Sequence, residues 1–131
     1  MPTHVTIAKV EHEPQSWIGT STSESRQRIE TILKDFLEIT ARLPGFIGFY
    51  NGEGAGASIP GHFHFQFFER PQGREPFPLE QVAAQAHPLK SVAIRRDRYP
   101  ITTLYFRGQR EEIVEKGDDV GWLLDRYLPK R

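Results

Sequence analysis

Hydrophobic and polar residues alternate almost strictly over residues 62–68. The polar positions are His62, His64 and Gln66, and the apolar positions are Phe63, Phe65 and Phe67. Since side chains along a strand point alternately to opposite faces, the pattern predicts a strand with one polar face and one phenylalanine face. Burying each phenylalanine contributes about 1.5–3 kcal/mol, and a slip by one residue would bury the histidines instead. The phenylalanines therefore fix the direction in which the histidines point.

A helical pattern precedes this strand. Apolar or small side chains recur at helical spacing at Ile29, Ile32, Leu33, Phe36, Thr40 and Leu43. A capping-box sequence at residues 21–24 predicts the start of the helix, and Pro44-Gly45 predicts its end. Glu30 and Lys34 are spaced to pair on its exposed side. Residues 3–10 and 46–50 fit two further strands.

The pattern in the second half of the chain predicts further short helices and strands. Residues 70–78 contain three prolines and a glycine and predict a loop, and residues 79–86 fit a short helix. We expect strands at residues 91–98 and 101–107 to join the same sheet, and a helical segment over about 109–128, in two pieces because of Gly117 and Gly121. The expected fold is a single α+β domain over residues 1–131, with a mostly antiparallel sheet, a long helix on its phenylalanine face, and a histidine face open to substrate.

Composition excludes several classes of function. The chain has 131 residues, with 17 Lys and Arg against 17 Asp and Glu, and no cysteine. Without cysteine there is no disulfide framework and no cysteine-ligated zinc. A net charge of zero gives no long-range attraction to nucleic acid or anionic membrane, so we expect neither partner. No apolar run approaches the roughly 18 residues of a spanning helix, and the start lacks a signal-peptide pattern, so we expect a soluble, cytoplasmic protein.

The polar row follows a glycine-rich loop with the sequence Asn-Gly-Glu-Gly-Ala-Gly-Ala-Ser over residues 51–58. Glycine and alanine leave backbone N–H groups unshielded, and Ser58 adds a hydroxyl donor. Consecutive N–H groups in such a loop can bind an anion. Loop and strand together predict a nucleophile, a hydrogen-bond donor and a phosphate cradle close to one reacting phosphorus.

Residues 51–66, from the glycine-rich loop to His-x-His-x-Gln, resemble the active-site segment of the histidine-triad (HIT-like) superfamily. The most similar branch has glutamine in place of the third histidine: galactose-1-phosphate uridylyltransferase, diadenosine tetraphosphate phosphorylase and the GDP-hexose phosphorylases. The resemblance covers about sixteen residues, and the order of helix and strands is consistent with it over about residues 3–107. It implies a HIT-like fold.

The resemblance implies that His64 is a nucleophile that attacks the α-phosphorus of a nucleotide, giving a nucleotidyl-histidine intermediate. It assigns the orientation of that ring to the carbonyl of His62. Donors to the phosphoryl oxygens would be Gln66, Ser58 and the loop amides of Gly52, Gly54 and Gly56, while Asn51 would tie the loop to the histidine strand. The chemistry is reasonable, because one imidazole nitrogen can attack while the other is hydrogen-bonded.

The implied activity is that of a nucleotidyltransferase or nucleotide phosphorylase acting on a nucleotide phosphoanhydride or a nucleotide sugar. Glutamine cannot shuttle a proton, which favours transfer to phosphate or a sugar phosphate over hydrolysis. No acidic cluster motivates Mg²⁺, so we expect no cofactor. In this family, a strand hairpin that would precede residue 3 forms the pocket for the base. Three alternatives follow for this chain: a homodimer that completes the site, a diverged single unit, or a fragment.

Three other interpretations use the same residues. His62, His64 and Glu69 match much of the first cupin motif, in which two histidines and a glutamate bind a divalent metal. However, Pro76 stands where that motif has glycine, and a long helix before the site does not suit an all-β barrel. The domain could instead bind a phosphate ligand without catalysis, or the two histidines could simply face solvent.

Overall fold

The computed structural model describes residues 3–17, 22–71, 76–85, 93–95, 103–105 and 108–115. The chain divides into two compact units, of which the second spans Gly73–Lys116. The described part of the first unit, residues 3–17 and 22–71, contains the whole histidine strand and the glycine-rich loop. The expectation of one domain over residues 1–131 remains a prediction.

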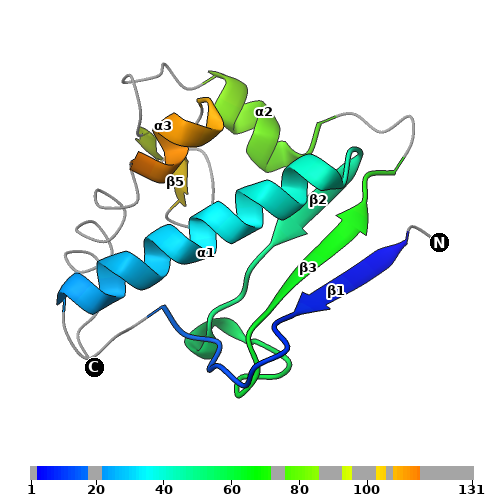
Figure 1. Cartoon of the computed structure of the whole chain (residues 1–131). Helices are drawn as coiled ribbons and strands as arrows, with labels where there is room; N and C mark the ends of the chain where they lie inside the picture. Colours follow the sequence, from blue (N-terminus) through cyan, green and yellow to red (C-terminus); the bar gives the residue numbers. More distant parts are fainter. Residues whose placement is uncertain are drawn as a thin grey trace. The chain divides into compact units, whose positions relative to one another are not determined.

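The first unit contains a three-stranded antiparallel sheet (Figure 1). Its strands are β1 (His4–Ala8), β2 (Phe46–Phe49) and β3 (His64–Glu69), and β3 lies in the centre, in the order β1-β3-β2. In the register, Thr6 of β1 and Phe49 of β2 both lie opposite Gln66. The α+β class and the antiparallel sheet are therefore confirmed.

The predicted helix is α1, Thr22–Arg42. The expected pair between Lys34 and Glu30 forms with an N–O distance of 2.6 Å. After the helix, Gly45 adopts φ +82°, a left-handed conformation that glycine takes at little cost and that commonly ends a helix. The chain then enters β2 directly.

The core of the first unit is the phenylalanine face of β3, extended by Phe63 directly before the strand. Phe63, Phe65 and Phe67 are buried, and packed against them are the α1 side chains Ile32, Phe36 and Ile39, together with Leu43 just after the helix. The Phe36 ring lies 5.3 Å from that of Phe65 and 5.6 Å from that of Phe67, between ring centroids. The helix contributes Ile39 rather than the expected Thr40, whose hydroxyl donates to the Phe36 carbonyl.

The second unit contains α2 (Pro78–Gln85), β4 (Ala93–Arg95), β5 (Thr103–Tyr105) and α3 (Arg110–Glu115). The prediction that the two later strands join the histidine sheet is wrong for their described residues. β4 pairs with β5 in a separate two-stranded antiparallel sheet, because strands that follow each other closely satisfy each other's backbone groups. α3 confirms the start of the expected helical segment, and both of its predicted glycine breaks lie outside the described residues.

Among the described residues, none of the helices has both the length and the apolar character needed to cross a membrane.

At Gly48 of β2, side chains of the helix and the sheet come close to the backbone. A Cβ at this position would lie 2.5 Å from Cε1 of Phe67 and 2.7 Å from Cζ of Phe36. We expect Gly48→Ala to lower the free energy of unfolding by about 1–3 kcal/mol, the usual cost of overpacking a core. Urea denaturation followed by circular dichroism measures the change.

Gly61 provides the matched control, because a Cβ there meets nothing within 4 Å. Gly61→Ala should change the free energy of unfolding by no more than about 0.5 kcal/mol. Equal effects of the two substitutions would contradict the close packing of Phe36 over Gly48.

Tyr50 follows β2 and packs its ring against Phe63 and Phe65. Its hydroxyl oxygen is buried without a hydrogen-bond partner among the described residues. Burial raises the pKa of the phenol above its ordinary value, and the positive charge of Arg28 opposes part of that rise. The folded state therefore keeps the phenolic proton at a pH where the unfolded chain loses it.

We expect Tyr50→Phe to leave the free energy of unfolding unchanged or raise it by up to about 1 kcal/mol at neutral pH, because it removes an unpaired polar group. Above pH 10 the wild-type protein should lose stability relative to Tyr50→Phe, since ionisation then favours unfolding. Denaturation curves at pH 8 and above pH 10 measure the difference. A difference that stays constant across that range would contradict the raised pKa.

Candidate functional site

β3 places His64 and Gln66 on the face opposite the phenylalanines. The two residues alternate with Phe65, and Nε2 of Gln66 lies 3.4 Å from Nε2 of His64. On β1, the residue opposite His64 is Ala8, whose small side chain lies on the same face of the sheet. The predicted polar row therefore exists between His64 and Gln66, side by side on the central strand.

His62 contributes to this row differently from the prediction, because it precedes β3 and is not a strand residue. Its ring Nε2 lies 2.7 Å from the carbonyl oxygen of Lys9, and its ring makes an edge-on contact with that of His12 at 4.7 Å between centroids. Its backbone carbonyl oxygen lies 2.9 Å from Nδ1 of His64. His62 thus meets His64 through its backbone, while its side chain binds the segment after β1.

The His64 imidazole is held in one orientation. A carbonyl oxygen can only accept, so Nδ1 of neutral His64 carries the proton that it donates to His62. Nε2 is then the unprotonated nitrogen, and its lone pair accepts from the Gln66 amide at 3.4 Å. A neutral imidazole fixed in this way has the tautomer and direction that a nucleophile requires.

The expectation of a histidine face open to substrate is wrong at His64, which is only 2% exposed. Its place in the central strand removes the backbone from solvent, and the bond to His62 keeps the ring against the protein. Gln66 beside it is half-buried. Little of the His64 residue is therefore accessible to a ligand.

The glycine-rich loop forms one short 3-10 turn, Glu53–Ala55, and Gly56 follows it with φ +81°. Part of its donor capacity is used internally, because the N–H of Ala55 donates to the Gly52 carbonyl at 2.9 Å. Gly54, Gly56 and Ser58 are exposed. Of the predicted phosphate-binding positions, these three present their surfaces to solvent.

Asn51 is linked to the histidine strand through its backbone carbonyl and by way of Gln15, a residue that the sequence did not suggest. The side chain of Gln15 donates from Nε2 to the Asn51 carbonyl at 2.9 Å and to the His64 carbonyl at 2.8 Å. Its Oε1 accepts from the backbone N–H of His64 at 2.7 Å. Gln15 follows Pro14 in a polar segment, and 49 positions separate it from His64, so no local pattern indicates this contact.

The alternative metal site is not assembled. His64 and Glu69 are five residues apart on one strand, so they point to opposite faces, and the Glu69 carboxylate accepts from the Thr3 hydroxyl at 3.1 Å. Within the ranges that the structure describes, no group of three or more His, Cys, Asp or Glu residues is arranged to hold a metal ion. The cupin interpretation with His62, His64 and Glu69 is therefore wrong in its geometry.

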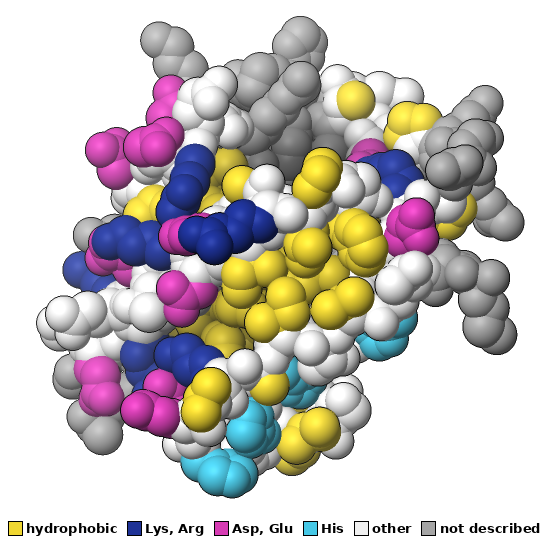
Figure 2. Space-filling view, turned by 45° about the vertical axis from the view of Figure 1, so that its right-hand side comes forward, with side chains coloured by type: hydrophobic (Ala, Val, Ile, Leu, Met, Phe, Trp, Pro, Cys, Tyr) yellow, Lys and Arg dark blue, Asp and Glu magenta, His cyan; other side chains and the backbone are white. Residues whose placement is uncertain are grey.

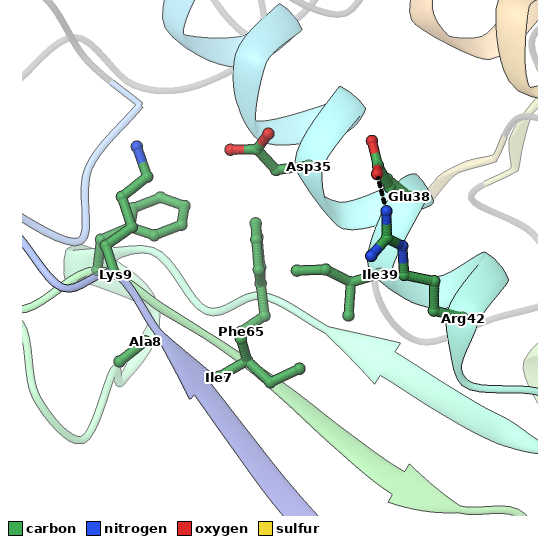
Figure 3. A pocket seen from close by; sticks show the side chains of 9 residues that line it. Ile7, Ala8, Lys9, Asp35, Glu38, Ile39, Arg42 and Phe65 are labelled. Carbon is green, nitrogen blue, oxygen red and sulfur yellow. Dashed lines mark hydrogen bonds and ion pairs between the residues drawn. The ribbon is translucent and has the colours of Figure 1, made fainter.

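A separate groove of about 340 Å³ lies between α1 and β1. In Figure 3, Phe65 and Ile39 lie at its apolar floor, with Lys9 and Asp35 at its margin and the ion pair of Glu38 with Arg42 beside it. Figure 2 shows hydrophobic side chains gathered on one face of the molecule, flanked by charged ones. Since its floor is the phenylalanine face, this groove is distinct from the candidate site on the histidine face.

The fold and the site together define an α+β domain whose central strand presents a fixed, buried histidine beside a glutamine. Residues 1–69 match a sequence family described as "Domain of unknown function (DUF4922)". The match covers more than half of the chain, so the chain belongs to this family, and it ends at the last residue of β3. No curated protein and no solved structure matches the chain.

The hydrogen bonds predict opposite tautomers for the two histidines. His64 should carry its proton on Nδ1, and His62 should carry its proton on Nε2, because each of these nitrogens faces a carbonyl oxygen. Long-range ¹H–¹⁵N spectra at alkaline pH, with neutral rings, measure both. The single variants His62→Gln and His64→Gln assign the signals, and an Nε2–H signal from His64 would contradict the site geometry.

Proposed function

We propose that this domain is HIT-like and catalyses nucleotidyl transfer through His64, as a nucleotidyltransferase or nucleotide phosphorylase. The observation that supports it most directly is the fixed His64 ring, whose Nδ1 faces the His62 carbonyl and whose Nε2 faces Gln66. The resemblance of residues 51–66 to the glutamine-bearing HIT-like branch assigns the same roles to these three residues. Two independent arguments thus point to one nitrogen.

In the proposed first step, the lone pair on Nε2 of His64 attacks the α-phosphorus of the nucleotide. An N–P bond forms, and the bond from phosphorus to the leaving phosphate oxygen breaks, so that the leaving group takes the electron pair. The proton stays on Nδ1 and is donated in a hydrogen bond to the His62 carbonyl, which stabilises the positive charge that develops on the ring. The Gln66 amide, 3.4 Å from Nε2 before the reaction, would then donate to a phosphoryl oxygen.

In the proposed second step, an oxygen of inorganic phosphate or a sugar phosphate attacks the same phosphorus. The P–N bond breaks, and its electron pair returns to Nε2. The glutamine amide does not titrate, so it can neither take a proton from a water molecule nor give one to it. A phosphate oxygen is already anionic, so it attacks without a general base, and this favours phosphorolysis or transfer over hydrolysis.

The phosphates of the substrate would bind at the glycine-rich loop. Gly54, Gly56 and Ser58 are exposed, and Gly52 and Asn51 begin the loop. The chain has no net charge to attract an anion from a distance, so recognition would depend on these local donors. A nucleotide or a nucleotide sugar is the substrate class that fits this proposal.

Incubation with nucleotides labelled at the α-phosphorus tests the proposal. We expect an acid-labile label on the wild-type protein, lost by at least about 1000-fold in His64→Asn, because the nucleophile is removed. His4→Asn is the matched control, since His4 is an exposed histidine of β1, and it should keep the label. Adding inorganic phosphate to the labelled protein should release a nucleoside diphosphate faster than water releases the monophosphate.

The burial of His64 favours a second candidate function, a domain that binds a phosphate ligand without catalysis. With only 2% of the residue exposed, a ligand could occupy the loop and never reach Nε2. Calorimetric binding of a nucleotide by both wild type and His64→Asn, without any label on the wild type, would support this function and overturn the first.

A further inference from the structure

Gln15 and His64 are the buried polar residues of the part of the chain that the structure describes, at 0% and 2% exposed. They are bound to each other. Both backbone groups of His64 use the Gln15 side chain, the N–H at 2.7 Å and the carbonyl at 2.8 Å. A buried polar side chain is costly unless it is fully hydrogen-bonded, so this pairing requires a specific geometry.

The Gln15 amide takes the place of a neighbouring strand. β2 ends at Phe49, which lies opposite Gln66, so the backbone of His64 has no β2 partner on that side. A primary amide offers one carbonyl acceptor and one N–H₂ donor group, as a peptide unit offers one acceptor and one donor. Gln15 presents both to His64 and completes the hydrogen bonding of β3 where β2 leaves the sheet.

The same residue holds both ends of the segment 51–60, which contains the glycine-rich loop. Its Nε2 donates to the carbonyl of Asn51 at 2.9 Å, and its backbone N–H donates to the carbonyl of Pro60 at 2.9 Å. The segment around it is fixed in turn, since the N–H of Phe63 donates to the Glu13 carbonyl at 2.7 Å. One residue therefore connects the start of the loop, the end of the loop and the candidate nucleophile.

We propose that Gln15 is a positioning residue that sets the His64 imidazole and the two ends of the loop over residues 51–60 at a fixed distance from each other. This inference rests on the proposed function, in which the loop holds the phosphates and His64 attacks the phosphorus. A ring locked to the backbone by Nδ1 can move only with that backbone, so the amide that holds the backbone sets the distance of attack. An error of about 1 Å in such a distance can cost about 100-fold in rate.

Two substitutions, Gln15→Glu and Gln15→Met, separate the hydrogen bond that the Gln15 amide accepts from the two that it donates. The Gln15→Glu variant would keep an acceptor for the His64 N–H but lose both donated bonds, and Gln15→Met loses all three hydrogen bonds at nearly the same volume. The matched control is Gln27→Glu and Gln27→Met, because Gln27 is an exposed amide on α1. Circular dichroism and thermal unfolding show which variants are folded at the assay temperature.

The first measurement is independent of catalysis. In the ligand-free protein, hydrogen exchange of the His64 backbone amide and the ring tautomer of His64 report the geometry directly. We expect faster exchange in Gln15→Met, a changed ring signal in both Gln15 variants, and wild-type values in both Gln27 variants. Unchanged ring and amide signals in a folded Gln15 variant would overturn the inference, whether or not the wild type becomes labelled. If Gln15→Met does not fold, the His64 ring signal of Gln15→Glu tests the inference: a changed signal supports it and an unchanged signal overturns it.

The second measurement is the single-turnover rate of His64 labelling at saturating nucleotide. We expect a 10- to 100-fold fall in both Gln15 variants and less than a twofold change in both Gln27 variants. A substitution that merely lowered stability would reduce the labelled fraction without changing the rate of the folded molecules, so wild-type rates would overturn the positioning role. Absence of label on wild type together with changed ring signals would overturn the proposed function and leave the geometric role of Gln15 supported.

Discussion

The arrangement of this domain depends on the alternation of side chains along β3. Three phenylalanines bury one face of the strand and fix its register, and that register alone directs His64 and Gln66 to the other face. Any slip would cost the burial of the phenylalanines, which is far larger than the free energy of one hydrogen bond. Hydrophobic packing on one side of the strand thus positions polar chemistry on the other side.

Register places the histidine, but it does not fix the ring. Backbone carbonyl groups do that: Nδ1 of His64 faces the carbonyl of His62, and the ring of His62 faces the carbonyl of Lys9. These acceptors belong to segments that flank the strands, where the chain has left the regular sheet. Irregular backbone beside a regular strand provides acceptors that a complete sheet would have used for its own ladder.

The sequence predicted the elements whose signal is local. The phenylalanine alternation indicated β3, the spacing from Ile29 to Leu43 indicated α1, and Pro44-Gly45 indicated its end. It did not indicate that β4 and β5 form a sheet separate from that of β3, because membership of a sheet depends on contacts between distant segments and not on the pattern within a strand. The role of Gln15 and the burial of His64 were missed for the same reason: both arise from backbone groups contributed by other parts of the chain.

The groups that hold His64 all lie within residues 1–69, which is also the extent of the family match. The second unit, Gly73–Lys116, contributes none of the site residues named above. On the proposed function, the sheet, Gln15 and the His62 carbonyl hold the nucleophile, and a further contribution is needed only to recognise the leaving group and the acceptor. On the proposed chemistry, Gln66 restricts that choice, because a residue that cannot transfer a proton favours an acceptor that is already anionic. The glycine-rich loop has exposed residues and no cationic side chain among residues 51–58. On the same proposal, this loop would bind the phosphate groups of both the nucleotide and the acceptor.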